Sequence, residues 1–158
     1  LDMRRLKLYL DTSVLNFYFA DSSPKEKEAT QELFREIKSE SYEAFISSIV
    51  VEEISEASEA KQKVLVSLIE KYNLMPLEID EEIESLANLY IQNKIIPQKY
   101  EADAVHIAAA VINDLDVIVS WNFEHIVKLK TKLAVNGINK MEGYKEIEIY
   151  SPMEVIEL

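Results

Sequence analysis

Apolar residues along the chain follow two spacings, one typical of strands and one typical of helices. Short apolar or alternating runs predict strands, and these runs cover residues 6–10, 42–47, 74–79, 117–119 and 146–150. Apolar positions three or four residues apart predict helices, over residues 14–19, 25–40, 49–57, 60–72, 100–113, 123–135 and 152–156, with a further helix after Asp80. Because strands and helices alternate, we expect an α/β fold whose parallel sheet is covered by helices on both faces.

Local signals mark where several of these elements begin and end. Asp80 is expected to cap the helix that follows it, and Pro76 places the third strand at an edge of the sheet. The pair Asn136-Gly137 predicts the end of the helix before it. No repeat, low-complexity stretch or linker interrupts the pattern, so we expect residues 1–158 to form a single domain.

The first strand ends on a carboxylate. Residues 6–10 run into Asp11, and Thr12 and Ser13 can cap a helix that begins at Val14. An acid at a junction of strand and helix is typical of chemistry in open α/β sheets, because ligands bind outside the carboxyl ends of their strands. The alternative is that Asp11 serves only as a helix cap.

Composition excludes several classes of site. The chain has 2 glycines, too few for a glycine-rich phosphate loop. It has no cysteine, which excludes a thiol nucleophile, a thiolate metal site and disulfides, and is compatible with a cytoplasmic protein. No apolar run is long enough to cross a bilayer, so we expect no membrane partner.

The formal net charge is -12, which argues against broad electrostatic binding to nucleic acid. A metal-dependent nuclease stays compatible with this charge, because divalent cations invert the field of an acidic pocket. An acidic surface also suits a basic protein partner.

Four polar residues stand in otherwise apolar settings: Asp11 after the first strand, Glu53 on a helix, Asp103 on an alanine-rich helix, and Asn122 after the fourth strand. Burying a carboxylate is costly unless it is paired or binds a metal. The three acids can form an oxygen site for Mg²⁺ or Mn²⁺, whereas Asp103 could instead face solvent near a helix start. His106, one turn after Asp103, is expected to be a satisfied core histidine rather than a ligand.

Four segments that contain these residues resemble, in order, the four signatures of the PIN domain family. They read Leu-Tyr-Leu-Asp-Thr-Ser-Val-Leu over 8–15, Ile-Ser-Ser-Ile-Val-Val-Glu-Glu-Ile over 46–54, Glu-Ala-Asp-Ala-Val-His-Ile-Ala-Ala-Ala over 101–110, and Val-Ile-Val-Ser-Trp-Asn-Phe over 117–123. The ordered set is more specific than any one segment and spans nearly the whole chain. More narrowly, the chain resembles the VapC-like toxins of prokaryotic toxin–antitoxin pairs.

The resemblance implies a three-layer α/β/α sandwich with a central, mostly parallel sheet of about five strands. It also implies a ribonuclease that depends on Mg²⁺ or Mn²⁺ and hydrolyses phosphodiester bonds of RNA in the cytoplasm. The partners that it implies are an RNA substrate, a second copy of the chain in a homodimer, and an antitoxin protein that covers the groove of the active site.

By position, the resemblance assigns metal or catalytic roles to Asp11, Glu53 and Asp103, and support of the site to Ser120 and Thr12. Glu53 matches the family pattern better than Glu52, because an aliphatic residue follows it. Adjacent helix residues point about a third of a turn apart, so the two glutamates do not enter one site. The fourth catalytic position, usually an aspartate in the family, is Asn122 in this chain.

Two other functions compete with this one. Because Asn122 brings no negative charge, the chain could be a weakened or inactive PIN fold that binds RNA or protein. A phosphatase or phospho-receiver also carries an aspartate at a strand end, but the haloacid type needs a second aspartate where Ser13 stands.

The segment after the fourth strand has further aromatic and basic residues. Trp121 and Phe123 are expected to pack in the core and His125 to lie in the first turn of the following helix, the alternative being that Trp121 or His125 stacks on RNA. A basic run is expected to form a solvated face rather than a phosphate-guiding edge, and it consists of Lys128, Lys130 and Lys132.

Overall fold

A computed structural model describes residues 4–158, so residues 1–3 of the expected domain lie outside the described part. The elements are, in chain order, β1 (Leu6–Leu10), α1 (Thr12–Phe17), α2 (Pro24–Lys38), β2 (Tyr42–Ser47), α3 (Ser48–Ser55), α4 (Glu59–Lys71), β3 (Met75–Leu77), α5 (Glu81–Gln92), η1 (Gln98–Tyr100), α6 (Glu101–Ile112), β4 (Val117–Val119), α7 (Leu129–Met141), β5 (Glu148–Tyr150) and α8 (Pro152–Ile156). Within residues 4–158, no helix has both the length and the apolar character needed to cross a membrane.

The strands form one sheet of five in the order β3-β2-β1-β4-β5, and every neighbouring pair is parallel. The central strand is β1, which pairs with β2 on one side and β4 on the other. The expected α/β class and parallel sheet are therefore confirmed. Pro76 lies in β3 at an edge, where its missing N–H leaves no interior bond of the sheet unmade.

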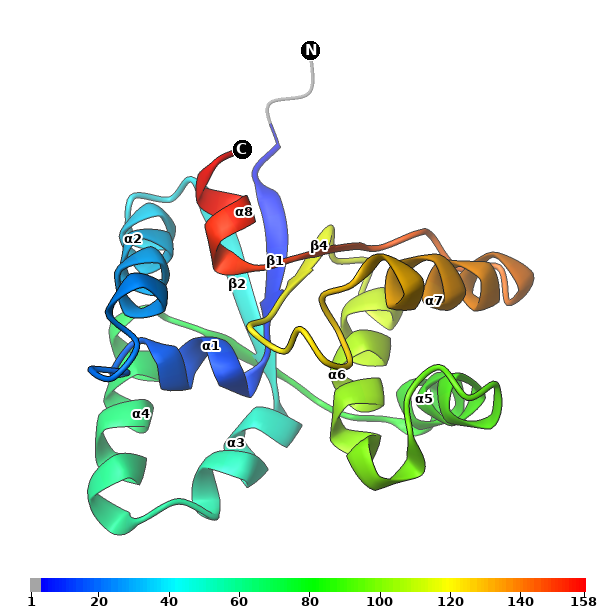
Figure 1. Cartoon of the computed structure of the whole chain (residues 1–158), viewed down its shortest axis with the longest axis horizontal. Coiled ribbons are helices and arrows are strands. Elements are labelled where there is room, and N and C mark those ends of the chain that lie inside the picture. Colours follow the sequence, from blue (N-terminus) through cyan, green and yellow to red (C-terminus); the bar gives the residue numbers. More distant parts are fainter. Residues whose placement is uncertain (1–3) are drawn as a thin grey trace.

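Alternating side chains of β1 divide the core into two halves. Tyr9 faces the cluster built with α5, α6 and α7, whereas Leu8 and Leu10 face the cluster built with α1, α2, α3, α4 and α8. Figure 1 shows these two groups of helices on opposite sides of the sheet. The expected three layers are thus confirmed, and they follow from the period-two pattern of the strands.

The carboxyl ends of the three central strands meet at one edge of the sheet. There β1 leads into Asp11, β2 leads into α3, and β4 leads into Ser120. The direction of strand order reverses between β1 and β4, because β2 and β3 lie on one side of β1 while β4 and β5 lie on the other. Such a switch point leaves a crevice outside the strand ends, which is where open α/β sheets hold their ligands.

The prediction for the helix after β4 was wrong. It was expected over residues 123–135, but α7 begins at Leu129 and continues through the Asn136-Gly137 pair to Met141. Buried Asn136 donates from Nδ2 to the Ile147 carbonyl oxygen (2.9 Å) and accepts from the Ile147 N–H (2.8 Å). These bonds to the segment before β5 hold the helix together at a pair that local propensity would use as a stop.

Residues before α7 form turns instead of a helix. Both Ile126 and Val127 donate backbone N–H groups to the Asn122 carbonyl oxygen, at 3.1 and 2.8 Å. Trp121 is buried, as expected, and its Nε1 donates to Thr30 Oγ1 at 2.8 Å. The prediction that Phe123 packs in the core was wrong, since its side chain is 55% exposed. The segment is not helical, so no helix face directs this ring toward the core.

We expect Asn136→Ala to lower the free energy of unfolding by about 1–3 kcal/mol, because it leaves the buried Ile147 amide and carbonyl without partners. Urea denaturation followed by circular dichroism measures this change. The control is Asn88→Ala, at an exposed position of α5, which should leave stability nearly unchanged. Equal stability of the two variants would contradict the explanation given for the length of α7.

Candidate active site

Asp11 lies at the end of β1 and is 3% exposed. Its carboxylate accepts from Ser13 Oγ (2.5 Å), from Ser120 Oγ (2.5 Å) and from the Val14 N–H (3.3 Å). The last of these bonds makes Asp11 itself the cap of α1, in place of the expected Thr12 and Ser13, which lie inside the helix. The cap and the buried site are therefore one residue, and the two interpretations of Asp11 do not exclude each other.

All three groups that donate to Asp11 are uncharged. Burial raises the pKa of the Asp11 carboxyl, and the nearby His106 together with the hydrogen bonds from Ser120 and Ser13 lowers it by less. Holding a negative charge here thus costs free energy, because hydroxyl and amide donors replace only part of the lost hydration.

Glu53, on α3, is held by a chain of side chains that crosses the sheet edge. Its Oε1 accepts from Thr12 Oγ1 and from His106 Nε2, both at 2.8 Å. His106 Nδ1 lies 2.7 Å from the Tyr9 hydroxyl, which lies 2.7 Å from Ser47 Oγ. Burial raises the pKa of Tyr9, so its hydroxyl keeps the proton. These contacts hold the ring of His106 with Nε2 directed at Glu53.

This support makes Glu53 unlike Asp11. Burial opposes its ionisation, but the hydrogen bond and charge of His106 and the bond from Thr12 outweigh burial and lower the pKa of Glu53. The expectation that His106 is a satisfied core histidine is confirmed, since the ring is buried and both nitrogens are bonded. Glu52, the residue before Glu53, is exposed and lines a separate cavity, so only one of the two glutamates enters the site.

Asp103, in the first turn of α6, lies half-buried against two residues that follow β4. Its Oδ2 accepts from Asn122 Nδ2 at 3.1 Å and lies 3.2 Å from His125 Nδ1. Burial raises the pKa of the Asp103 carboxyl, and the negative charge of Asp11 raises it further, against the lowering effect of His106 and His125. Asp103 therefore lies against Asn122 and His125 and not in open solvent.

The prediction that His125 lies in the first turn of a helix was wrong. It lies in the turn segment before α7, where its backbone N–H donates to Asn122 Oδ1 at 2.9 Å. Because the segment is not helical, the ring turns back to Asp103 and joins the site. Sequence reasoning also missed Ser13, although its position two residues after Asp11 on the first helical turn was a usable signal.

The model of the PIN domain family matches residues 8–125 of this chain, which include all four acid and amide positions described above. The chain belongs to the PIN domain family. The sequence resemblance is therefore confirmed. The match begins within β1, includes β2, β3 and β4, and ends before β5.

A solved structure has the same fold. It is a chain in the crystal structure of VapBC2 from Rickettsia felis bound to a DNA fragment from their promoter, with a TM-score of 0.57 and 14% sequence identity over 92% of this chain and 98% of that chain. At this identity the likeness shows the fold alone. No curated protein sequence matches the chain.

The carboxylate oxygens at this site suit a hard divalent cation by their chemistry, but their arrangement is not a complete coordination site. Within residues 4–158, no group of three or more His, Cys, Asp and Glu side chains is arranged ready to hold a metal. Yet buried Asp11 and half-buried Asp103 carry charges that repel each other, and His106, whose charge lowers the pKa of both, binds Glu53. An Mg²⁺ or Mn²⁺ ion prefers oxygen donors of this kind and would relieve the repulsion.

We expect Asp11→Asn to raise the melting temperature at pH 7 in EDTA. A carboxyl whose folded-state pKa is raised destabilises the fold as pH rises through the interval from its unfolded to its folded pKa, and the penalty is absent below that interval. The stabilisation should therefore shrink as pH falls toward about 4, near the unfolded pKa of an aspartate.

Calorimetry between these pH values measures the effect. Asp114→Asn makes the same chemical change at an exposed position just beyond the far end of α6 and serves as the control. A gain in stability that did not depend on pH would show that burial of the Asp11 charge is not its cause.

Proposed function

We propose that this chain is a metal-dependent endoribonuclease, the toxin of a type II toxin–antitoxin pair. The observation that carries the proposal is the buried carboxylate of Asp11, which lies at the switch point of a PIN-family sheet and accepts its hydrogen bonds from neutral groups of the described residues. A cation that completes the site would offset the cost of this buried charge, and RNA supplies the phosphate that the cation would hold. A ribonuclease toxin acts on RNA in the cytoplasm, so we place the protein there.

In this proposal Asp11, Asp103 and Glu53 hold the ion, which is Mg²⁺ or Mn²⁺. When bound, the ion polarises a water and offsets the charge that builds up on the phosphate. Ser120 and Ser13 fix both oxygens of Asp11. These bonds keep the carboxylate in one orientation, so little reorganisation is needed when RNA binds.

The other two acids are oriented by their own neighbours. Thr12 and His106 fix Oε1 of Glu53, while Asn122 and His125 hold Oδ2 of Asp103. Asn122 stands at the fourth catalytic position and contributes an amide hydrogen bond there instead of a charge. We propose that three acids suffice for cleavage and that the amide positions one of them.

An acidic cavity supports the proposed antitoxin partner. It has a volume of about 1080 Å³ between α3, α5 and α6, beside the start of the helix that carries Asp103. Four of its lining residues are glutamates, namely Glu52, Glu81, Glu84 and Glu101. A partner segment with lysine or arginine side chains matches this charge and would lie close enough to the acids to cover them.

Apolar surface supports the proposed homodimer. Leu129 and Leu133, one turn apart on α7, are 69% and 64% exposed.

We further propose that residues 126–158 belong to the same domain as the family match, because β5 completes the sheet beside β4. Light scattering on the purified chain should give twice its mass of 18.2 kDa, and a coexpressed antitoxin should copurify with it; a monomer, or a partner that does not copurify, would contradict the respective assignment.

We expect purified protein to cleave a mixed pool of labelled RNAs in Mg²⁺ or Mn²⁺ and not in EDTA. Asp103→Asn should lower the rate by about 10²–10³-fold, the typical cost of removing one group that stabilises charge in a transition state. Asp114→Asn, at the other end of the same helix, is the control for the loss of one negative charge. Full activity of Asp103→Asn with the fold intact would overturn the proposed site.

A second function rests on Asn122, whose Nδ2 donates to Asp103 at the place where a fourth acid would bring charge. A PIN domain that binds RNA or protein without cutting is consistent with this substitution. We expect Asn122→Asp to change the metal dependence of an enzyme that is already active. If the wild type is inert and Asn122→Asp gains metal-dependent cleavage in the same assay, the natural protein is the binding module.

A further inference from the structure

Next to Asp103, two aromatic rings form a stack whose outer member is exposed. Tyr100, the residue before α6, lies with its ring 4.1 Å from the ring of His125, centroid to centroid, at an interplanar angle of 36°. The Tyr100 side chain is 38% exposed, while His125 beneath it is mostly covered. We propose that Tyr100 is a stacking platform for one base of a single-stranded RNA whose phosphate occupies the acid site, an inference that rests on the proposed function.

The inner ring of the stack is fixed from three directions. His125 Nδ1 lies 3.2 Å from Asp103 Oδ2, its backbone N–H donates to Asn122, and its carbonyl oxygen accepts from Thr131 Oγ1 at 3.0 Å. A ring that rests on such a base keeps its orientation before any ligand arrives, which lowers the entropy lost on binding. The same contacts place the platform one ring away from a proposed metal-binding carboxylate.

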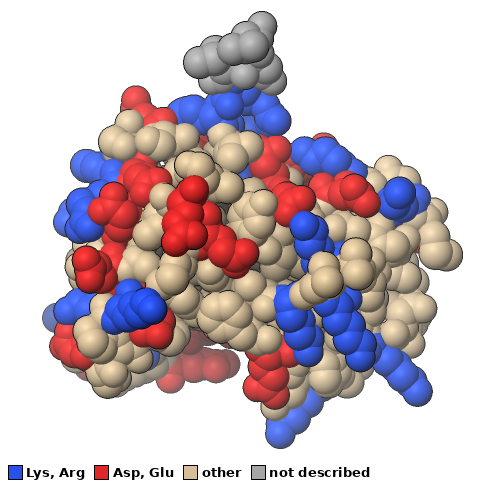
Figure 2. Space-filling view, turned by 45° about the horizontal axis from the view of Figure 1, so that its top comes forward, with Lys and Arg blue, Asp and Glu red and all other residues tan. Residues whose placement is uncertain are grey.

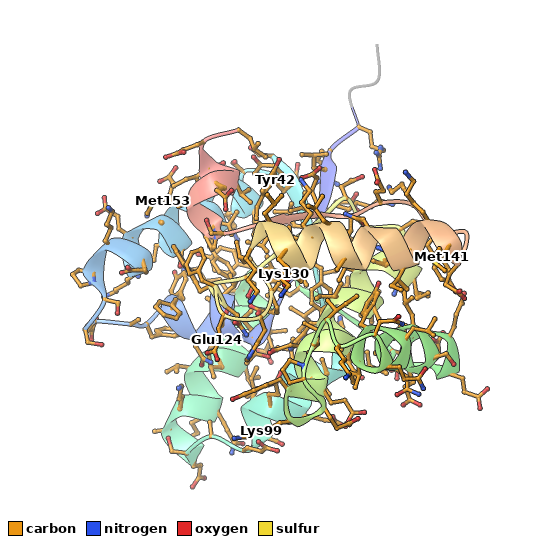
Figure 3. The ribbon with its side chains drawn as sticks, turned by 45° about the vertical axis from the view of Figure 1, so that its right-hand side comes forward. Tyr42, Lys99, Glu124, Lys130, Met141 and Met153 are labelled. Atoms are coloured by element: carbon orange, nitrogen blue, oxygen red, sulfur yellow. The ribbon has the colours of Figure 1, made fainter. Side chains whose placement is uncertain are left out.

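Charge near the platform favours a phosphate backbone on one side only. Lys99 Nζ lies over the Tyr100 ring, 5.8 Å from its centroid, so a base that stacks there displaces this flexible side chain, whose charge stays available to a phosphate. A separate small cavity of about 170 Å³, between the end of α5 and the start of α7, is lined by Lys94, Lys128 and Lys130. Figure 3 places Lys99 at the start of α6 and Lys130 at the start of α7, with Glu124 in the turn segment between them in that view.

The other side of α6 repels a polyanion. There the acidic cavity gathers Glu52, Glu81, Glu84 and Glu101. Figure 2 shows that basic side chains gather in the lower right of the visible face, on the side where α5 and α7 lie in Figure 1. In a chain of net charge -12, this local excess of lysine steers the strand across Tyr100. One acidic side chain, Glu124, lies at the platform, with Oε1 3.5 Å from His125 Nε2.

The chemistry of the platform suits unpaired bases of any kind. Every base has a flat face that stacks on an aromatic ring, so such contacts bind single strands with little sequence preference. A duplex keeps its bases stacked on one another and has none to offer. The platform therefore selects single-stranded RNA and sets the position of one base relative to the bond that is cut.

The test compares Tyr100→Leu, Tyr100→Phe and Tyr100→Trp with the wild type. The control is Phe19→Leu, because Phe19 is a similarly exposed ring (40%) that also rests on an aromatic neighbour, Tyr18, with centroids 4.9 Å apart. Melting temperatures of all variants are measured first. Binding of a dye-labelled single-stranded RNA octamer is then followed by fluorescence anisotropy in Mg²⁺, beside an abasic sugar-phosphate strand of equal length.

We expect Tyr100→Leu to weaken binding of the RNA about tenfold, the order typical of one lost base stack, while the abasic strand binds all variants equally. Tyr100→Phe and Tyr100→Trp should bind like the wild type, and RNA should quench the emission of the new indole. In cleavage assays the loss should appear in KM and leave kcat nearly unchanged. A merely structural role for Tyr100 would change melting temperature or kcat and would weaken both strands alike.

The outcomes separate this inference from the proposed function. Metal-dependent cleavage by the wild type with an unchanged KM in Tyr100→Leu would overturn the platform and leave the nuclease standing. RNA binding that depends on Tyr100 without any cleavage would uphold the platform on a binding module. A wild type that neither binds nor cuts single-stranded RNA would overturn both.

Discussion

The structure depends on one costly placement, the buried carboxylate of Asp11 at the end of the central strand. Its charge is accommodated because two hydroxyls reach it, Ser13 from the first turn of α1 and Ser120 from the residue after β4. These donors come from segments more than a hundred residues apart in sequence, so the carboxylate ties the two strands at the switch point together. A parallel sheet makes this possible because the ends of β1 and β4 lie side by side.

The three acids around this point are not equivalent. Glu53 is stabilised in its charged form by His106 and Thr12, whereas burial and mutual repulsion disfavour the charged forms of Asp11 and Asp103. Glu53 therefore serves as a fixed negative charge, whereas the charged forms of Asp11 and Asp103 would be stabilised by a cation. The line of hydrogen bonds from Ser47 through Tyr9 to His106 contributes to this difference, because it holds the ring with Nε2 directed at Glu53.

The surroundings of the site divide by charge, and this division explains how an acidic protein could hold RNA. On one side of α6 four glutamates line a large cavity, and on the other Lys99 lies over the exposed ring of Tyr100, while further lysines line a smaller cavity between α5 and α7. A basic protein segment and a polyanionic strand would thus approach the same acids from different directions. Net charge describes the whole molecule, while binding depends on the few charges within about a Debye length of the ligand, about 8–10 Å at physiological ionic strength.

The sequence by itself determined the sheet, the layers and the place of Asp11, because each depends on short-range pattern. The alternation of side chains in β1 directs them to the two halves of the core. An acid directly after a strand lies at the edge of the sheet where the strands end, and this located Asp11. The place of Pro76 at an edge followed from its missing N–H in the same way. Only the tertiary structure decided the segment after β4: buried hydrogen bonds of Asn136 to Ile147 extend α7 through a pair that locally favours a stop. Because the helix begins later, Phe123 is exposed and His125 turns toward Asp103. Contacts between residues far apart in sequence overrode local propensity there, and no pattern within the segment itself records them.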